Sequence, residues 1–321
     1  MIRAFFASEN IMRRVASLKT ETVVVGLGEL IWDMLPAGRQ LGGAPTNFAY
    51  ISSLLGHPSI VASRVGTDAL GSEATARLQR MSINTNYLQL DETHPTGTVG
   101  VSVDERGEAH FQMNYCSAWD FLEWTESWQE LALRADAVCF GTLGQREPQA
   151  RETIMRFLER TRPEALRVFD VNLRHTFFTT DMLQSSLLLA GVVKLNHEEL
   201  SVVARMLELK ETAEVKLARQ LIESYRLALV AITRGEHGSL LITKDDAIAH
   251  TGFRVNVVDT IGAGDAFTAA LVHFYLRGAK LEVISEAANR MGSWVATHAG
   301  ATPELSKETL KEMFRNLASH P

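Results

Sequence analysis

The sequence predicts an α/β protein with a doubly wound, mostly parallel sheet, helices on both faces and a small β lid. Three observations carry this prediction. Short β-branched apolar runs, typical of buried parallel strands, recur along the chain. Segments in which apolar residues have helical spacing lie between these runs. One further stretch alternates apolar and polar residues, which is typical of an antiparallel hairpin.

The expected strands and helices follow one another in the order that a parallel sheet requires. The first expected strand is TVVVGL at 22–27, a β-branched run that ends in glycine. Similar runs predict further strands at 59–65, 135–141, 166–171, 191–196 and 227–235. Helical spacing is found at 46–56, 72–81, 147–161, 197–209 and 266–276. Strand alternating with helix indicates one parallel sheet covered on both faces.

The stretch GTVGVSVDERGEAHFQMNY at 97–115 breaks this rhythm, because its alternation around DERGE indicates a half-polar hairpin. Such a hairpin does not belong inside a parallel sheet. We therefore expect segments of about 32–41 and 96–116 to form a small β lid over the carboxyl ends of the strands, where ligands of such sheets bind. A surface hairpin without a role is the alternative. The exposed strand edges of a lid could pair with a second copy, which favours a homodimer.

Domain organisation is expected to be simple. No internal repeat, low-complexity tract or linker marks a boundary, so residues 21–321 are expected to form one domain that includes the lid. Residues 1–20 are expected to be a flexible N-terminal extension; their basic side chains only faintly resemble a transit peptide.

Composition excludes several classes of protein. The chain is 46% apolar and 22% charged, with a net charge of -6 and no basic block, which argues against nucleic acid as a partner. No apolar run approaches the roughly 20 residues that a membrane-spanning helix needs. The only cysteines, Cys116 and Cys139, lack metal or disulfide spacing, which fits a cytoplasmic location.

The stretch VVDTIGAGDAF at 257–267 has the character of an anion-binding loop. Glycines at Gly262 and Gly264, on either side of Ala263, let backbone N–H groups crowd one point, and the helix that follows adds its positive dipole end. The carboxylate of Asp265 would repel an anion unless it has a task of its own, such as accepting a proton from an attacking hydroxyl. The alternative is that Asp265 merely caps the helix.

A second motif, GGAPTNFAYISSLLG at 42–56, opens a helix with Gly42, Gly43 and Asn47, which allows close backbone approach to a polyhydroxylated ligand. The chain has no GxxxxGK[ST] loop, and GLGELI lacks the third glycine of the dinucleotide motif. With VGTDALG and DTIGAGDAF, the second motif resembles the two signature regions of the PfkB family of carbohydrate kinases, which have the ribokinase-like fold. The matching positions are Gly42, Gly43, Pro45, Asn47, Ala49, Gly56 and Gly66.

The resemblance implies roles for particular residues. Asp265 would be the catalytic base, and the amides of residues 262–264 would stabilise the γ-phosphoryl group of ATP in transit. Asp33 in GELIWD would bind the sugar, with Gly42, Gly43 and Asn47 beside it. Arg174, in the DxNxR segment DVNLR, would lie near the transferred phosphate, although a salt bridge with Asp170 is the alternative.

The nucleotide site is implied in the same way. TRGEHG at 233–238 resembles the family's TxGxxG loop, which assigns Thr233, Gly235 and Gly238 to ATP. Lys194 would reach a phosphate and Asn289 would edge the adenine; a surface lysine and a helix-face asparagine are the alternatives.

Metal sites are implied by two further segments. NHEE at 196–199 resembles the NxxE motif, which is linked to the magnesium and phosphate network in the family. This implies that Asn196 and Glu199 belong to that network, in which the protein usually contacts the metal through water. Solvated acids in the first turn of a helix are the alternative. Asp259 corresponds to a position near a monovalent cation, such as K⁺, in some relatives.

The start GELIWDMLPAGRQLGGAPTNFAY looks most like that of fructokinases. This implies an ATP and Mg²⁺ dependent transfer to fructose, at its 6-position. Another small substrate, such as ribose or 2-keto-3-deoxygluconate, is the alternative; kinases for the latter typically lack the proline found here at Pro45. A sugar sensor without turnover is a further alternative.

Overall fold

The computed structural model describes residues 21–35, 38–103 and 109–317. The segment expected to be an N-terminal extension, 1–20, and the turn of the expected hairpin, 104–108, lie outside the described residues.

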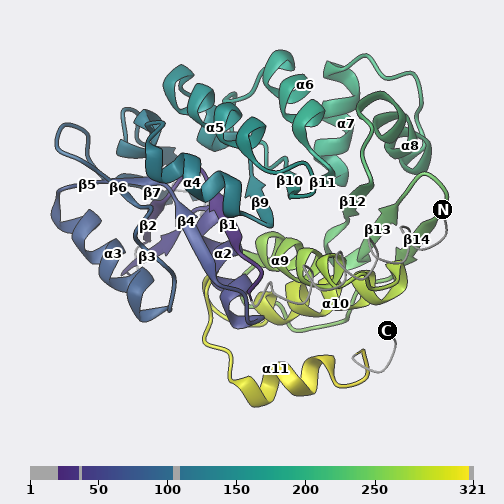
Figure 1. The fold of residues 1–321 in the computed structure, drawn as a ribbon. Coiled ribbons are helices and arrows are strands. Elements are labelled where there is room, and N and C mark those ends of the chain that lie inside the picture. Colours follow the sequence, from purple (N-terminus) through teal and green to yellow (C-terminus); the bar gives the residue numbers. More distant parts are fainter. Residues whose placement is uncertain (1–20, 36–37, 104–108, 318–321) are drawn as a thin grey trace, which may run out of the picture.

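The main sheet has eight strands in the order β14-β13-β12-β11-β10-β9-β1-β4. Pairing is parallel from β4 through β12, whereas β13 and β14 are antiparallel (Figure 1). The expectation of a mostly parallel sheet is therefore confirmed. The strands are β1 (Val24–Leu27), β4 (Ser59–Ala62), β9 (Ala137–Phe140), β10 (Leu166–Asp170), β11 (Val192–Asn196), β12 (Leu229–Thr233), β13 (Ser239–Ile242) and β14 (Ala247–His250).

One expected strand differs from the structure. The apolar run at 59–65 divides after Ala62, and its second part becomes β5 (Arg64–Gly66), which pairs with β6 (Gln89–Asp91) in a separate two-stranded sheet. The side chain of Arg64 reaches the carboxylate of Asp91 there, with 2.9 Å between Nε and Oδ2. This contact between side chains distant in sequence is not visible in a local apolar pattern.

Helices cover both faces of the sheet, as predicted. One face packs against α4 (Glu126–Arg134), α5 (Pro148–Arg160), α6 (Thr180–Leu189), α7 (His197–Met206) and α8 (Glu214–Tyr225). The other face packs against α2 (Ala44–Leu54), α9 (Ala263–Leu276) and α10 (Leu281–Ala296), with α3 (Ala69–Arg80) and α11 (Lys307–Phe314) beside them. In Figure 1, α5 to α8 lie above the sheet and α9 to α11 lie below it.

Side-chain alternation along the strands explains the two layers. In β1, Val25 and Leu27 join the core on the α5 side, whereas Val24 joins the core on the α9 side. Successive residues of a strand point to opposite faces, so a continuous apolar run is what a sheet buried on both faces requires. In the described part of the chain, no helix is both long and apolar enough to cross a membrane.

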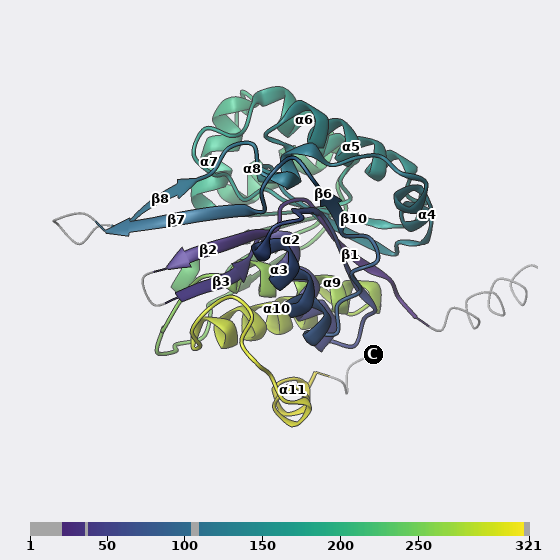
Figure 2. The same cartoon turned by 90° about the vertical axis from the view of Figure 1, so that its left-hand side faces the viewer.

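A second sheet stands apart from the main one. Its four strands, in the order β3-β2-β7-β8, are β2 (Ile31–Leu35), β3 (Gly38–Gly42), β7 (Gly97–Val103) and β8 (Ala109–Met113). Strands β7 and β8 pair antiparallel, which confirms the expected hairpin. Figure 2 shows this sheet extending away from the helical layers. We call these four strands the lid sheet. The side chain of Trp32 is fully buried, and its Nε1 donates to the carbonyl of Leu70 at 3.0 Å, which fixes the lid sheet to α3.

Candidate active site

The start of α2 is pressed against the end of β1. A Cβ atom on Gly26 would lie 2.0 Å from the carbonyl oxygen of Pro45, so only glycine allows this approach. Gly43 has φ +100°, and a Cβ there would lie 2.6 Å from the carbonyl oxygen of Glu29. The glycines thus bring the first turn of α2, with Asn47, to the carboxyl end of β1.

Helix α9 begins on the opposite side of the same point. Its N-cap is Gly262, with φ +77° and no side-chain cap. A Cβ on Gly262 would lie 2.6 Å from the Cβ of Ala301, and one on Gly264 would lie 2.9 Å from Nζ of Lys194. The first N–H groups of a helix have no partner within the helix, and they carry the positive end of its dipole. This geometry suits an anion.

Asp265 lies in the first turn of α9 and faces α2. Its Oδ2 accepts a hydrogen bond of 2.8 Å from Nδ2 of Asn47, and its side chain does not cap the helix. The capping alternative is therefore wrong. The pKa of Asp265 is raised to about 7: burial and the nearby carboxylate of Asp170 raise it, whereas Lys194, Asn47 and Arg174 oppose the increase. A carboxyl group with this pKa can exchange a proton near neutral pH.

A buried ion pair lies beneath the start of α9. Nζ of Lys194 donates to Oδ1 of Asp170 at 3.0 Å, and the hydroxyl of Thr268 donates to Oδ2 of Asp170 at 2.8 Å. Lys194 is only 7% exposed, so it is not a surface lysine. Burial alone would lower the pKa of Lys194, but the carboxylates of Asp170, Glu199 and Asp265 outweigh burial and raise it. Lys194 therefore brings a fixed positive charge beside Gly264.

The DxNxR segment does not form the strand-end salt bridge considered as an alternative. Asp170 binds Lys194 and Thr268, whereas Arg174 is exposed. Arg174 stands between Asn172 and His175, both with positive φ, at 42° and 49°. Non-glycine residues in this conformation store strain and cluster at functional sites.

Asp33 lies on β2 of the lid sheet. Burial raises the pKa of Asp33 to about 6; the charge of Arg174 lowers it and that of Asp259 raises it. A Cβ on Gly42 would lie 2.7 Å from Oδ2 of Asp33, so a larger residue at this point of β3 would displace the carboxylate of Asp33. The charge of Arg174 thus acts on both Asp33 and Asp265, although the three residues come from distant segments.

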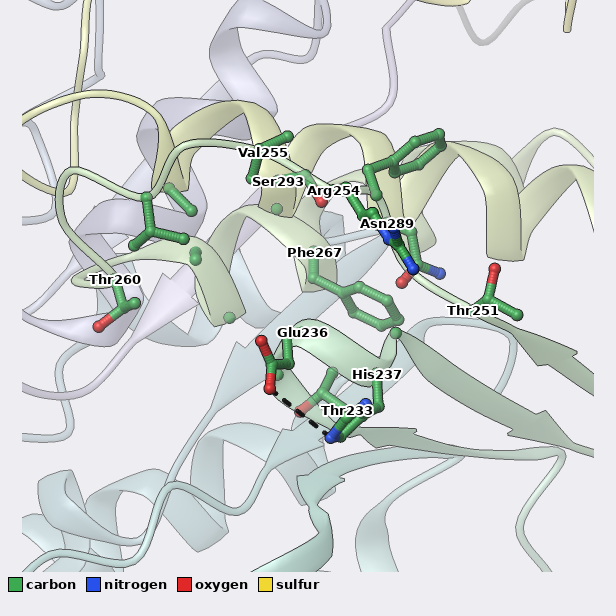
Figure 3. A pocket seen from close by; sticks show the side chains of 18 residues that line it. Thr233, Glu236, His237, Thr251, Arg254, Val255, Thr260, Phe267, Asn289 and Ser293 are labelled. Atoms are coloured by element: carbon green, nitrogen blue, oxygen red, sulfur yellow. Dashed lines mark ion pairs between the residues drawn. The ribbon is translucent and has the colours of Figure 1, made fainter.

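A cavity of about 700 Å³ extends from the start of α9 toward β13, a size typical of small-molecule sites. Figure 3 shows its lining: Thr233, Phe267 and Asn289 point into it, and Glu236 pairs with His237 at its rim at 3.8 Å. The predicted nucleotide residues that line it are Thr233, Gly235, Gly238 and Asn289, together with Ala263 and Gly264 of the anion-binding loop. Asn289 is 6% exposed, and its Nδ2 donates to Ser239 and Ser285.

The NHEE segment forms a capping box at the start of α7. Asn196 accepts from the N–H of Glu199, and the carboxylate of Glu199 accepts from the N–H of Asn196 and of Leu173, at 2.8 and 2.9 Å. Glu199 is only 9% exposed, so it is not a solvated acid. Because both oxygens already accept from backbone groups, a metal contact through water fits better than direct ligation.

Asp259 joins two loops near the start of α9. Its Oδ1 accepts from the N–H of Ile261 and its Oδ2 from the N–H of Gly300, both at 3.0 Å. In the described ranges, no group of three or more His, Cys, Asp or Glu side chains is arranged to hold a metal ion.

Two features of the site were missed by sequence reasoning. Glu29, which follows β1, is 2% exposed, and burial raises its pKa to about 7. The segment containing Phe253, Arg254 and Val255 lines the cavity. A charged residue within the apolar run after β1 was a usable signal for Glu29, because a buried charge needs a partner. Nothing local marks the second segment, since it reaches the cavity only through the fold.

Comparison with known proteins agrees with this geometry. Residues 27–308 match the pfkB family carbohydrate kinases. A fructokinase of Salmonella typhimurium is 33% identical over 258 residues, covering 77% of this chain and 82% of the fructokinase. The structure of fructokinase from Vibrio cholerae O395 in fructose, ADP and calcium ion bound form has a TM-score of 0.76 and 25% identity, and the match covers 91% of this chain and 98% of that one. An uncharacterized sugar kinase from Pyrococcus horikoshii in complex with ATP has a TM-score of 0.77 and 27% identity, with 92% and 99% covered.

The fold and the match over most of the chain define an enzyme of the sugar phosphotransferase class. The chain belongs to the pfkB family of carbohydrate kinases. The family resemblance and the ribokinase-like fold expected from the two signature regions are thereby confirmed.

Proposed function

We propose that this protein is an ATP-dependent fructokinase, which transfers the γ-phosphoryl group of ATP to the 6-hydroxyl of fructose. The observation that carries the proposal is the position of Asp265: it lies in the first turn of α9, directly after Gly264, which lines the cavity, and its pKa is raised to about 7, chiefly by burial. The choice of fructose is supported by the fructokinases among the relatives.

In the proposed reaction, the carboxylate of Asp265 accepts the proton of the sugar hydroxyl. The hydroxyl oxygen forms the new bond to the γ-phosphorus, the bond from that phosphorus to the bridging oxygen breaks, and ADP leaves with the electron pair. The hydrogen bond from Asn47 orients the carboxylate of Asp265 for this transfer. The N–H groups at 262–264 stabilise charge on the transferred group, as preorganised donors do.

Two cations are proposed to act beside these amides. Lys194 lies against Gly264 and is held by Asp170, so its charge is fixed where phosphate oxygens would lie. Arg174 is exposed at the mouth of the site and can approach the transferred phosphate or the sugar. Thr233, Gly235, Gly238 and Asn289 would hold the nucleotide in the cavity.

Bound Mg²⁺ would neutralise phosphate charge. Glu199 and Asn196 could meet it through water, which agrees with the use of their polar groups in the capping box. Asp259 and the nearby loop are the proposed place of a monovalent cation.

The lid sheet is proposed to close over the sugar against Asp33, Gly42, Gly43 and Asn47, which would exclude water from the reaction.

We also infer that the lid sheet pairs with that of a second copy, because β3 and β8 are its edges. Light scattering should then give twice the chain mass of 35.5 kDa; a single chain mass would contradict the dimer.

The first experiment is ATP-dependent ADP release with fructose, ribose, glucose, adenosine and 2-keto-3-deoxygluconate. We expect selective turnover of fructose. Turnover of a different compound would retain Asp265 as the base and change the substrate. Sugar binding without turnover of any compound would contradict the kinase and favour a sugar sensor.

A further inference from the structure

Glu29 is a buried carboxyl group next to the reaction centre that the proposed mechanism does not use. It follows β1 directly and is 2% exposed. Its Oε1 accepts a hydrogen bond from the N–H of Ala44 at 3.2 Å, whereas its Oε2 is buried without a partner among the described residues. An unpaired buried carboxylate oxygen is costly, so the group should have a task that offsets this cost.

The contact with Ala44 gives α2 a cap that its own sequence lacks. Ala44 is the first residue of α2, and the N-cap, Gly43, has no side chain to accept a hydrogen bond. Glu29 supplies the missing acceptor from a different element, and a carboxylate at the start of a helix also interacts favourably with the helix dipole. Gly43 itself is pressed against the backbone of Glu29, since a Cβ added to Gly43 would lie 2.6 Å from that carbonyl oxygen. The two contacts fix the direction in which α2 begins.

The first turn of α2 holds the partner of the catalytic base. The N–H of Asn47 donates to the carbonyl of Gly43 at 3.0 Å, and Nδ2 of Asn47 donates to Oδ2 of Asp265 at 2.8 Å. Asn47 is 4% exposed, so its side chain can move little unless α2 moves with it. A displacement of the start of α2 therefore changes the orientation of Asp265.

Glu29 and Asp265 also interact through their charges. The pKa of Glu29 is raised to about 7: burial and the Asp265 carboxylate raise it, while the hydrogen bond from Ala44 and the charge of Arg174 lower it. The interaction is reciprocal, so a negative charge on Glu29 favours the protonated form of Asp265. The other groups that act on Asp265 are Asp170, Lys194, Arg174 and Asn47, and their effects are larger.

We propose that Glu29 is a positioning residue for phosphoryl transfer: its carboxyl group caps α2 and thereby holds Asn47 against Asp265. This inference rests on the proposed role of Asp265 as the base. Glu29 does not contact the reacting atoms, and its effect should reach them only through α2 and through its charge.

The test compares Glu29→Ala, Glu29→Gln and the wild type with the sugar that the wild type turns over best. Glu29→Ala removes the cap, and we expect kcat/KM for the sugar to fall at least about 10-fold, since small misplacements of catalytic groups have effects of this size. Glu29→Gln keeps an acceptor for the N–H of Ala44 and removes the charge. We expect it to recover most of the activity and to move the acid limb of the kcat/KM profile to lower pH by roughly half a unit. The KM for ATP should stay within about twofold in both variants.

A cap far from the site provides the matched control. Ser306 caps α11 by accepting from the N–H of Thr309 at 3.1 Å, so Ser306→Ala should cost about 1 kcal/mol of stability without a change in the pH profile. The inference is overturned if Glu29→Ala has the kcat/KM of the wild type, or if Glu29→Gln is as impaired as Glu29→Ala. If Glu29→Ala fails to fold, Glu29→Asp takes its place, because its shorter side chain withdraws the acceptor from the N–H of Ala44. A kcat/KM at least about 10-fold below that of Glu29→Gln then supports the inference, and equal values contradict it. A fully active Asp265→Asn variant would instead contradict the proposed base.

Discussion

At the scale of single residues, the environment of each carboxyl group determines what it can do. The sequence contains 38 acidic residues, but burial raises the pKa of Asp33, Glu29 and Asp265 to between about 6 and about 7. These three groups come from β2, from the segment after β1 and from α9, and the charge of Arg174 lowers the pKa of each. A base that works near neutral pH should have a pKa near the working pH, and Asp265 meets this condition.

Asp265→Asn should lower kcat by about 100- to 10,000-fold, because general-base help is worth this much. An amide oxygen at this position can still accept from Asn47, so the fold should be retained. Steady-state kinetics with the preferred sugar measures the effect. Asp245→Asn, at an exposed position, is the matched control and should keep wild-type kinetics.

Asp265→Asn should also stabilise the protein at alkaline pH. The pKa of Asp265 is about 7 in the folded state, against an ordinary value of 3.8 for the unfolded chain, so between these values the folded state holds a proton that the unfolded state has lost. The contribution of Asp265 to the free energy of unfolding is therefore fully present below about pH 4, and it is lost as the pH rises through about 7. Above that pH, Asp265→Asn should raise the free energy of unfolding by a few kcal/mol, up to about 4. Urea unfolding at about pH 8 tests this, and an unchanged or lower stability would contradict the assigned charge state.

At the scale of elements, the lid sheet is fixed to the main sheet by one buried arginine. Arg146, which follows the turn after β9, donates through Nε and Nη2 to the two carboxylate oxygens of Asp120 at 2.7 and 2.6 Å. It also donates to the carbonyl of Asn114, directly after β8, at 2.6 Å, and it lies 4.1 Å from the ring centre of Trp119. The end of the lid hairpin is thereby attached to the carboxyl end of a central strand.

Arg146→Met should destabilise the protein by about 3–5 kcal/mol, because it leaves the buried carboxylate of Asp120 without its partner. Asp120→Asn combined with Arg146→Met should recover part of this loss, since the uncompensated charge is then absent. Urea unfolding of the two single variants and the double variant gives the coupling free energy. Additive losses would show that the pair does not fix the lid sheet.

At the scale of the whole molecule, the two ends of the main sheet have different tasks. The carboxyl ends of the strands hold the candidate site, whereas the opposite end holds a histidine pair, with 2.9 Å between Nε2 of His57 and Nδ1 of His273. Burial and the charge of Arg277 lower the pKa of both histidines, that of His273 to about 3. The pair therefore stays neutral in the folded protein and joins α9 to the segment between α2 and β4.

Acid should destabilise the protein through this pair. The pKa of His273 in the folded state lies below its value of 6.5 in the unfolded chain. The contribution of neutral His273 to the free energy of unfolding is therefore fully present above pH 6.5 and is lost as the pH falls. Between about pH 7 and about pH 5, one such histidine should cost roughly 1–2 kcal/mol. His273→Gln should reduce this loss in urea unfolding, whereas His237→Gln, at an exposed position, should not. Equal pH dependence of the wild type and His273→Gln would contradict a neutral pair.

Much of this architecture could be predicted from the sequence because its causes are local. Apolar runs predicted the buried strands, helical spacing predicted α2, α5, α7 and α9, and alternation predicted the β7–β8 hairpin. The glycines of the two signature regions identified the family, since tight backbone approach tolerates no other residue. The division of the run at 59–65 was missed, because the contact of Arg64 with Asp91 is not local.

The sequence by itself determined the alternation of strands and helices, the lid hairpin, the family to which the chain belongs and the segments that carry the candidate site. The tertiary structure alone decided the state of the groups in that site. Asn47 and Asp265 are 218 residues apart in the chain and 2.8 Å apart in space, and Glu29 accepts from the first residue of α2, which lies 15 residues further along the chain. Chain conformation depends on neighbouring residues, whereas desolvation and charge interactions depend on distance in space. A pKa near 7 for Asp265 is therefore a property of the fold.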